Sequence, residues 1–88
     1  MLQYHAAFYQ GESDWIVAKV LDFPGALSQG RTLNSARRMI RDALRSLAET
    51  LLEEGEPLPL PKPRARDRKA VFQEVIPLQI HVPAGVKN

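Results

Sequence analysis

Alternating hydrophobic and polar positions at the start of the chain predict two strands. Residues 2–10 and 15–21 are both rich in β-branched or aromatic residues, and residues 11–14 between them have turn composition. Three apolar residues fall on one face of the first strand: Tyr4, Ala6 and Phe8. Because the link is short, we predict that the two strands form an antiparallel hairpin.

A helical repeat dominates the middle of the chain. Thr32 can cap the start of a helix, Gly55 suits the position just past its end, and Pro57 follows. The apolar residues between them form one stripe about 140° wide, which suits a helix lying on a sheet. They are Leu33, Ala36, Ile40, Ala43, Leu44, Leu47 and Leu51. We therefore predict a helix over residues 33–54.

Residues 22–25, with proline and glycine, break the chain after the hairpin, and residues 26–29 can form a short third strand. After the helix, proline occupies every second position from 57 to 63, which favours an extended path. Apolar residues then alternate in a last strand: Phe72, Ile76, Leu78, Ile80 and Val82. Pro77 indicates an edge position for that strand.

These elements predict an α+β fold with the order ββ(β)αβ, in which one long helix packs on one face of an antiparallel sheet. We expect residues 1–88 to form one domain: the hairpin, third strand and helix over 2–54, a Pro/Arg-rich linker over 55–69, and a C-terminal strand over 70–83. A domain of this size buries roughly 60–65% of its unfolded surface. We therefore expect a homo-oligomer, dimer or tetramer, paired through the last strand at Phe72, Ile76, Leu78 and Ile80.

Composition narrows the class of protein. The chain has no cysteine, which excludes disulfides and thiolate metal sites. It has no apolar run long enough for a membrane span and no leader-like N-terminus, so we expect a soluble, cytoplasmic protein.

No catalytic constellation is evident. The strand region offers the carboxylates Glu12, Asp14 and Asp22, but the first two lie in a turn and the third lies at the opposite end of its strand. His5 and His81 stand alone, without a second ligand at metal-binding spacing. We predict that the protein is not an enzyme and holds no metal or cofactor.

Basic residues form two groups. On the helix, Arg38, Arg41 and Arg45 flank the apolar stripe and could contact a partner or a nucleic-acid backbone. Pairing within the helix, of Arg38 with Asp42 and of Arg45 with Asp42 and Glu49, is the alternative that we prefer.

The second group lies in the linker, where the cations Arg64, Arg66 and Arg68 stand among two lysines. They could bind RNA or an acidic protein surface. A solvated linker is the preferred interpretation, because no aromatic residues are interleaved for base stacking.

Several motifs occur in an order that resembles the HicB family of antitoxins. They comprise the break after the hairpin, the turn before the helix and the segment that ends the helix: Asp22, Phe23, Pro24, Gly25, Gln29, Gly30, Thr32, Gly55 and Pro57. Each also has a structural role, as a strand end, turn or cap. The resemblance implies a degenerate ribonuclease H-like fold and a HicA-like toxin, a small ribonuclease, as partner.

The sequence departs from the family pattern at Ala26, Arg31 and residues 34–35, where cysteine and acidic residues are usual. Many family members also carry a C-terminal DNA-binding domain, which we do not expect after Asn88. The resulting hypothesis is a non-catalytic antitoxin that neutralises its toxin by direct binding. Two alternatives stay open: a nucleic-acid-binding or regulatory protein that uses the basic helix face and linker, and an orphan scaffold.

Overall fold

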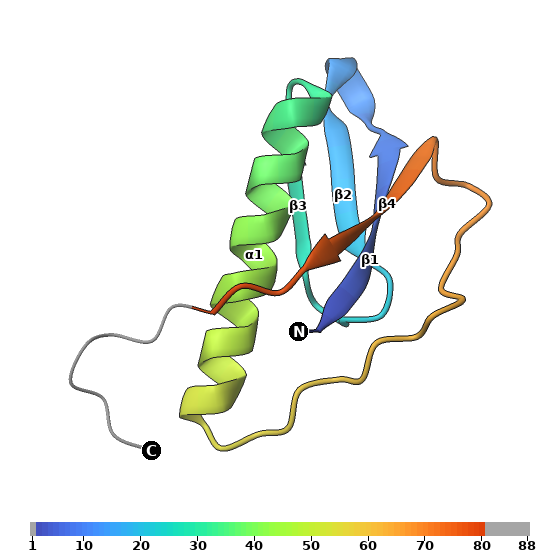
Figure 1. The fold of residues 1–88 in the computed structure, drawn as a ribbon. Coiled ribbons are helices and arrows are strands. Elements are labelled where there is room, and N and C mark those ends of the chain that lie inside the picture. Colours follow the sequence, from blue (N-terminus) through green and yellow to red (C-terminus); the bar gives the residue numbers. More distant parts are fainter. Residues whose placement is uncertain (1, 81–88) are drawn as a thin grey trace.

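The computed structural model describes residues 2–80, which form a four-stranded antiparallel sheet with one long helix on one face (Figure 1). The elements are β1 (Gln3–Gln10), a 3-10 turn η1 (Glu12–Asp14), β2 (Ile16–Val20), β3 (Leu27–Gly30), α1 (Leu33–Glu53) and β4 (Phe72–Pro77). The strand order is β3-β2-β1-β4. The predicted α+β class, element order and hairpin are confirmed.

The core lies between α1 and one face of the sheet. Alternate residues of β1 point into it, as the sequence pattern predicted, and the Tyr4 ring packs edge-on against Phe23 with the ring centroids 5.1 Å apart. The helix contributes buried residues one turn apart: Ala36, Ile40, Leu44 and Ala48. The small alanines at both ends of this row let the helix approach the sheet closely.

Both helix caps form as predicted. The Thr32 hydroxyl oxygen accepts a hydrogen bond from the Ser35 amide at 3.0 Å, which satisfies one of the unpaired donors of the first turn. At the other end Gly55 adopts φ +73°, and the Glu56 amide donates to the Leu51 carbonyl at 2.8 Å. This left-handed glycine and the reverse hydrogen bond form a Schellman motif, which ends the helix one residue earlier than predicted.

Gly30 has a different role from the turn that its sequence context indicated. It ends β3 as a buried residue paired with Ile16, and β3 is displaced by one residue from the predicted 26–29. A Cβ atom at Gly30 would lie 2.5 Å from the Ala36 amide nitrogen and 2.8 Å from the Ser35 carbonyl carbon. Glycine therefore permits the first turn of α1 to rest directly on the end of β3.

The connecting segment between α1 and β4, residues 54–71, is more than a solvated linker. It runs along the sheet (Figure 1), and the Tyr4 hydroxyl donates to the Pro59 carbonyl at 2.7 Å. Farther along, the Tyr9 hydroxyl donates to Asp67 at 2.7 Å and the Gln73 amide group donates to the Ala65 carbonyl at 2.7 Å. Since Tyr9 and Gln73 alternate with core residues, this part of the segment covers the sheet face opposite α1.

Burial and the hydrogen bond to Asp67 raise the pKa of the Tyr9 phenol to about 12. The pKa of Asp67 is lowered, by the hydrogen bond from the Lys69 amide and then by the one from Tyr9. The Tyr9 phenol therefore stays protonated and Asp67 stays ionised across the physiological pH range, the states in which they form this hydrogen bond.

The last strand is shorter than predicted. It covers Phe72–Pro77 of the expected 70–83, and residues 81–83 lie outside the described residues. Ile76 and Leu78 are buried in the chain's own core, whereas Phe72 and Ile80 are partly exposed. The edge position indicated by Pro77 is confirmed, because β4 is an outer strand of the sheet. Within residues 2–80, no helix is long and apolar enough to cross a bilayer.

Candidate binding surfaces

A buried carboxylate joins three distant parts of the chain. The Asp22 side chain is fully buried and accepts hydrogen bonds from the His5 amide at 2.8 Å, the His5 Nδ1 at 2.8 Å and the Lys62 amide at 3.0 Å. These donors belong to the first strand and to the connecting segment. The sequence placed Asp22 among the motif residues and left His5 without a partner. It did not predict that Asp22 joins His5 to Lys62.

Two opposing effects set the ionisation of Asp22. Burial raises the pKa of the carboxyl, but the hydrogen bonds from His5 and Lys62 together outweigh burial and hold its pKa below the usual value. Asp22 is therefore a charged structural junction at neutral pH. Every buried side-chain polar atom of the described residues, including those of Asp22, has a hydrogen-bond partner. Such complete pairing is typical of a structural residue.

The remaining motif residues are mostly parts of the scaffold. Phe23 is in the core, and Gly25 adopts φ +94°, a conformation that favours glycine. Thr32, Gly30 and Gly55 have the roles described above. Pro24, Gln29 and Pro57 are exposed, as are the three turn and cap residues Gly25, Thr32 and Gly55.

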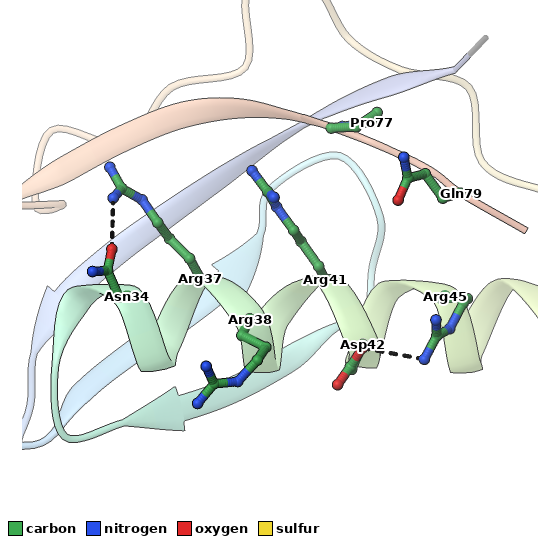
Figure 2. A pocket seen from close by; sticks show the side chains of 8 residues that line it. All are labelled: Asn34, Arg37, Arg38, Arg41, Asp42, Arg45, Pro77 and Gln79. Carbon is green, nitrogen blue, oxygen red and sulfur yellow. Dashed lines mark hydrogen bonds and ion pairs between the residues drawn. The ribbon is translucent and has the colours of Figure 1, made fainter.

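A basic groove lies between α1 and β4 (Figure 2). Its volume is about 430 Å³. Arg37 and Arg41 both reach from the helix toward β4, whereas Arg38 points away from that strand. The lining residues are Asn34, Arg37, Arg38, Arg41, Asp42, Arg45, Pro77 and Gln79. Four arginines and one aspartate make the groove attractive to anions.

Arg37 joins the helix to the edge strand, a role that the sequence did not reveal. Its Nε donates to both carboxylate oxygens of Glu74, at 3.2 and 3.1 Å, and one of its terminal nitrogens donates to Asn34 at 3.1 Å. The guanidinium also lies over the Phe72 ring, 5.3 Å from its centroid. Phe72 and Glu74 come 35 or more residues after Arg37, so no local pattern could have indicated the contact.

The predicted pairing within the helix is only partly present. Arg45 pairs with Asp42 at 3.1 Å, but among the described residues Arg38 does not pair with Asp42, and Arg45 does not pair with Glu49. Arg41 also has no ion pair within residues 2–80. Its side chain extends toward β4 instead (Figure 2). The helix surface therefore carries charge that its own neighbours do not neutralise.

We expect that reversing Arg38 and Arg41 together to glutamate leaves the fold intact. Both side chains are exposed and neither contributes to the core, so the free energy of unfolding should change by less than about 1 kcal/mol. Urea unfolding followed by circular dichroism measures this. A loss of several kcal/mol would mean that these arginines support the fold, and they would then be poor candidates for a binding role.

The linker arginines do not extend the helix groove. Arg64, Arg66 and Arg68 are exposed, and the first two line a separate hollow with His5 and Gln73 on the face that the connecting segment covers. The two basic groups of the sequence therefore form separate surfaces. Their separation gives no support to a single continuous track for a nucleic-acid strand.

The carboxylates considered for metal binding do not come together. Glu12 and Asp14 are exposed in the hairpin turn, and Asp22 is occupied by its three donors. Within residues 2–80 there is no group of three or more histidine, aspartate or glutamate residues placed to hold a metal ion.

The sequence matches no family model and no curated protein. The fold, in contrast, matches solved structures over most of the chain. The N-terminal domain of the Burkholderia pseudomallei antitoxin HicB superposes with a TM-score of 0.72 at 24% identity, covering 89% of this chain and 99% of that one. The longer Burkholderia pseudomallei antitoxin HicB gives 0.69 at 26% identity, with 88% of this chain and 63% of that one covered.

A chain of the HicA3 and HicB3 toxin–antitoxin complex also matches, with a TM-score of 0.68 at 19% identity. The match covers 92% of this chain and 100% of that one. The fold is therefore that of the HicB antitoxin N-terminal domain, as the resemblance in the sequence implied.

Proposed function

We propose that the chain acts as an antitoxin that binds a HicA-type toxin directly and prevents it from cleaving RNA. One observation carries the proposal: nearly the whole chain shares its fold with the HicB antitoxin N-terminal domain and with a chain of the HicA3 and HicB3 toxin–antitoxin complex. The chemistry is compatible with a binding role, because the buried polar residues are hydrogen-bonded within the scaffold. Such a rigid scaffold binds with little ordering cost.

The proposal is tested with the partner that the chain selects. The tagged chain is purified from its host, and mass spectrometry should identify a short basic protein bound to it. That protein, purified alone, should cleave RNA, and an equimolar amount of this chain should stop the cleavage. Calorimetry of the purified pair should show saturable binding.

The chain could stop cleavage by binding the RNA and shielding it, and this effect must be distinguished from inhibition of the toxin. The control is a second, unrelated ribonuclease acting on the same RNA, which the chain should leave fully active. Equal protection from both nucleases would reject toxin binding and favour the nucleic-acid-binding alternative. A chain that neither binds nor inhibits the co-purified protein would also reject the proposal.

Self-association stays a prediction. Of the four side chains proposed for the oligomer strand, Ile76 and Leu78 are committed to the chain's own core. A second copy could therefore pair only through the β4 backbone and the partly exposed Phe72 and Ile80. Light scattering on the purified chain measures its mass in solution.

A further inference from the structure

We propose that the groove between α1 and β4 binds an extended acidic protein segment, which joins the sheet as a new strand beside β4. The inference concerns a surface and the chemical class of its ligand, and it does not depend on the proposed antitoxin function. It is carried by three features of the described residues: an open strand edge, the spacing of the arginines, and the lack of a free acidic side chain on β4 to pair with Arg41 and Arg45.

The first feature is the open edge. The Leu78 amide donates to the Leu2 carbonyl at 2.9 Å, and the β1–β4 register pairs residues whose numbers sum to 80. Even-numbered residues of β4 therefore bond to β1, and the N–H and C=O groups of Gln73 and Val75 point outward. Pro77 offers only its carbonyl there. Unpaired donors and acceptors of this kind accept an added strand.

The second feature is the spacing of the arginines. Arg37, Arg41 and Arg45 lie one turn apart, about 6 Å along the helix. Alternate residues of a strand are about 6.6 Å apart. Arg37 contacts Glu74, and the groove continues past Pro77 and Gln79. Alternate side chains of a strand added along β4 would therefore reach Arg41 and Arg45 in turn.

Both of these arginines can accept a carboxylate. Arg41 extends toward β4 and has no ion pair within residues 2–80 (Figure 2). Arg45 pairs with Asp42, but both side chains are about half exposed, at 47% and 56%, and exposed pairs of this kind contribute little. An incoming carboxylate can replace Asp42 without a large cost.

The third feature selects the kind of partner. On its helix-facing side β4 carries a single acid, Glu74, which Arg37 already neutralises, so a second copy of β4 would bring no free carboxylate to Arg41 and Arg45. A nucleic-acid strand would supply charge, but none of the described residues that line the groove is aromatic and able to stack on its bases. An acidic segment satisfies both the backbone edge and the arginines.

The test uses short blocked peptides that alternate glutamate and threonine, labelled for fluorescence anisotropy. The full chain should bind the glutamate peptide at least about tenfold more tightly than the same peptide with lysine in place of glutamate. Amide resonances of Gln73 and Val75 should shift on binding. Equal affinity for the two peptides would overturn the proposal.

Strand addition has its own test. An added strand turns the N–H groups of alternate residues toward β4, so N-methylation at all threonines and N-methylation at all glutamates should have unequal effects. In an antiparallel strand the threonine amides face β4, and methylating them should abolish binding. Equal effects of the two modifications would show that the peptide is not held as a strand.

Charge-reversal variants test which arginines bind the peptide. Reversing Arg41 and Arg45 to glutamate should abolish binding of the glutamate peptide and create binding of the lysine peptide, a gain that an unfolded variant could not show. The matched control reverses Arg64 and Arg66, which should change the affinity for neither peptide.

Tighter, Arg41-dependent binding of a single-stranded oligonucleotide would instead assign the groove to nucleic acid. A stable dimer that excludes the peptide would assign the edge to a second copy. Either result would overturn the proposal.

Discussion

Replacement of Gly30 by alanine is expected to be among the most destabilising single substitutions in this chain. The new methyl group would lie 2.5 Å from the Ala36 amide nitrogen and 2.9 Å from its Cα, which are backbone atoms that no side-chain rotation can move aside. The first turn of α1 would have to lift from β3. We expect a loss of about 3 kcal/mol or more in the free energy of unfolding, a large part of the stability of a domain this small.

The matched control for Gly30 is Gly55→Ala. Gly55 also lies next to an end of α1, but a Cβ there would meet nothing within 4 Å. Its cost should come only from the left-handed backbone at φ +73°, about 1 kcal/mol. Thermal and urea unfolding of the two variants measure the difference. A smaller loss for Gly30→Ala than for Gly55→Ala would contradict the close-approach explanation.

Asp22→Asn is expected to have the second large effect. The substitution removes the charge that three donors share, and the new amide hydrogens would point at one of those donors. Losing charge-assisted hydrogen bonds at a buried site should cost about 2–3 kcal/mol at pH 7. Because the Lys62 amide loses its partner, the connecting segment should also become sensitive to proteolysis.

The dependence of this effect on pH follows from the direction of the Asp22 shift. The folded pKa lies below the ordinary value of 3.8, so the carboxylate stabilises the fold above about pH 4. That stabilisation is lost as the pH falls through the folded pKa. The difference between wild type and Asp22→Asn should therefore shrink in acid. Asp42→Asn, at an exposed pair, should cost under about 1 kcal/mol throughout. A difference that stays constant down to pH 2 would exclude the ionised junction.

Local patterns were sufficient for the elements of this fold. Thr32 and Gly55 marked the ends of α1 because a cap involves residues only a few positions apart. The apolar stripe located the buried face of the helix, and alternation located that of β1. These features depend on neighbours within one or two turns, which a single sequence displays directly.

The contacts that build the candidate surfaces could not be predicted in this way. Asp22 lies 17 residues from His5 and 40 from Lys62, and nothing in its local sequence indicates either donor. The direction of the Arg41 side chain toward β4 (Figure 2) likewise depends on where the last strand returns. The sequence indicated turn chemistry at Gly30, but close packing of the helix on β3 is what requires glycine.

The proline that ends β4 also limits what can happen at that edge. A β-strand with a long row of unpaired amides is a template for endless stacking of identical chains, and thus for fibres. Between Phe72 and Pro77, only the amides of Gln73 and Val75 face outward, and the ring of Pro77 interrupts the row. The open edge of β4 is therefore short and interrupted, which disfavours the repeated pairing of identical chains along it.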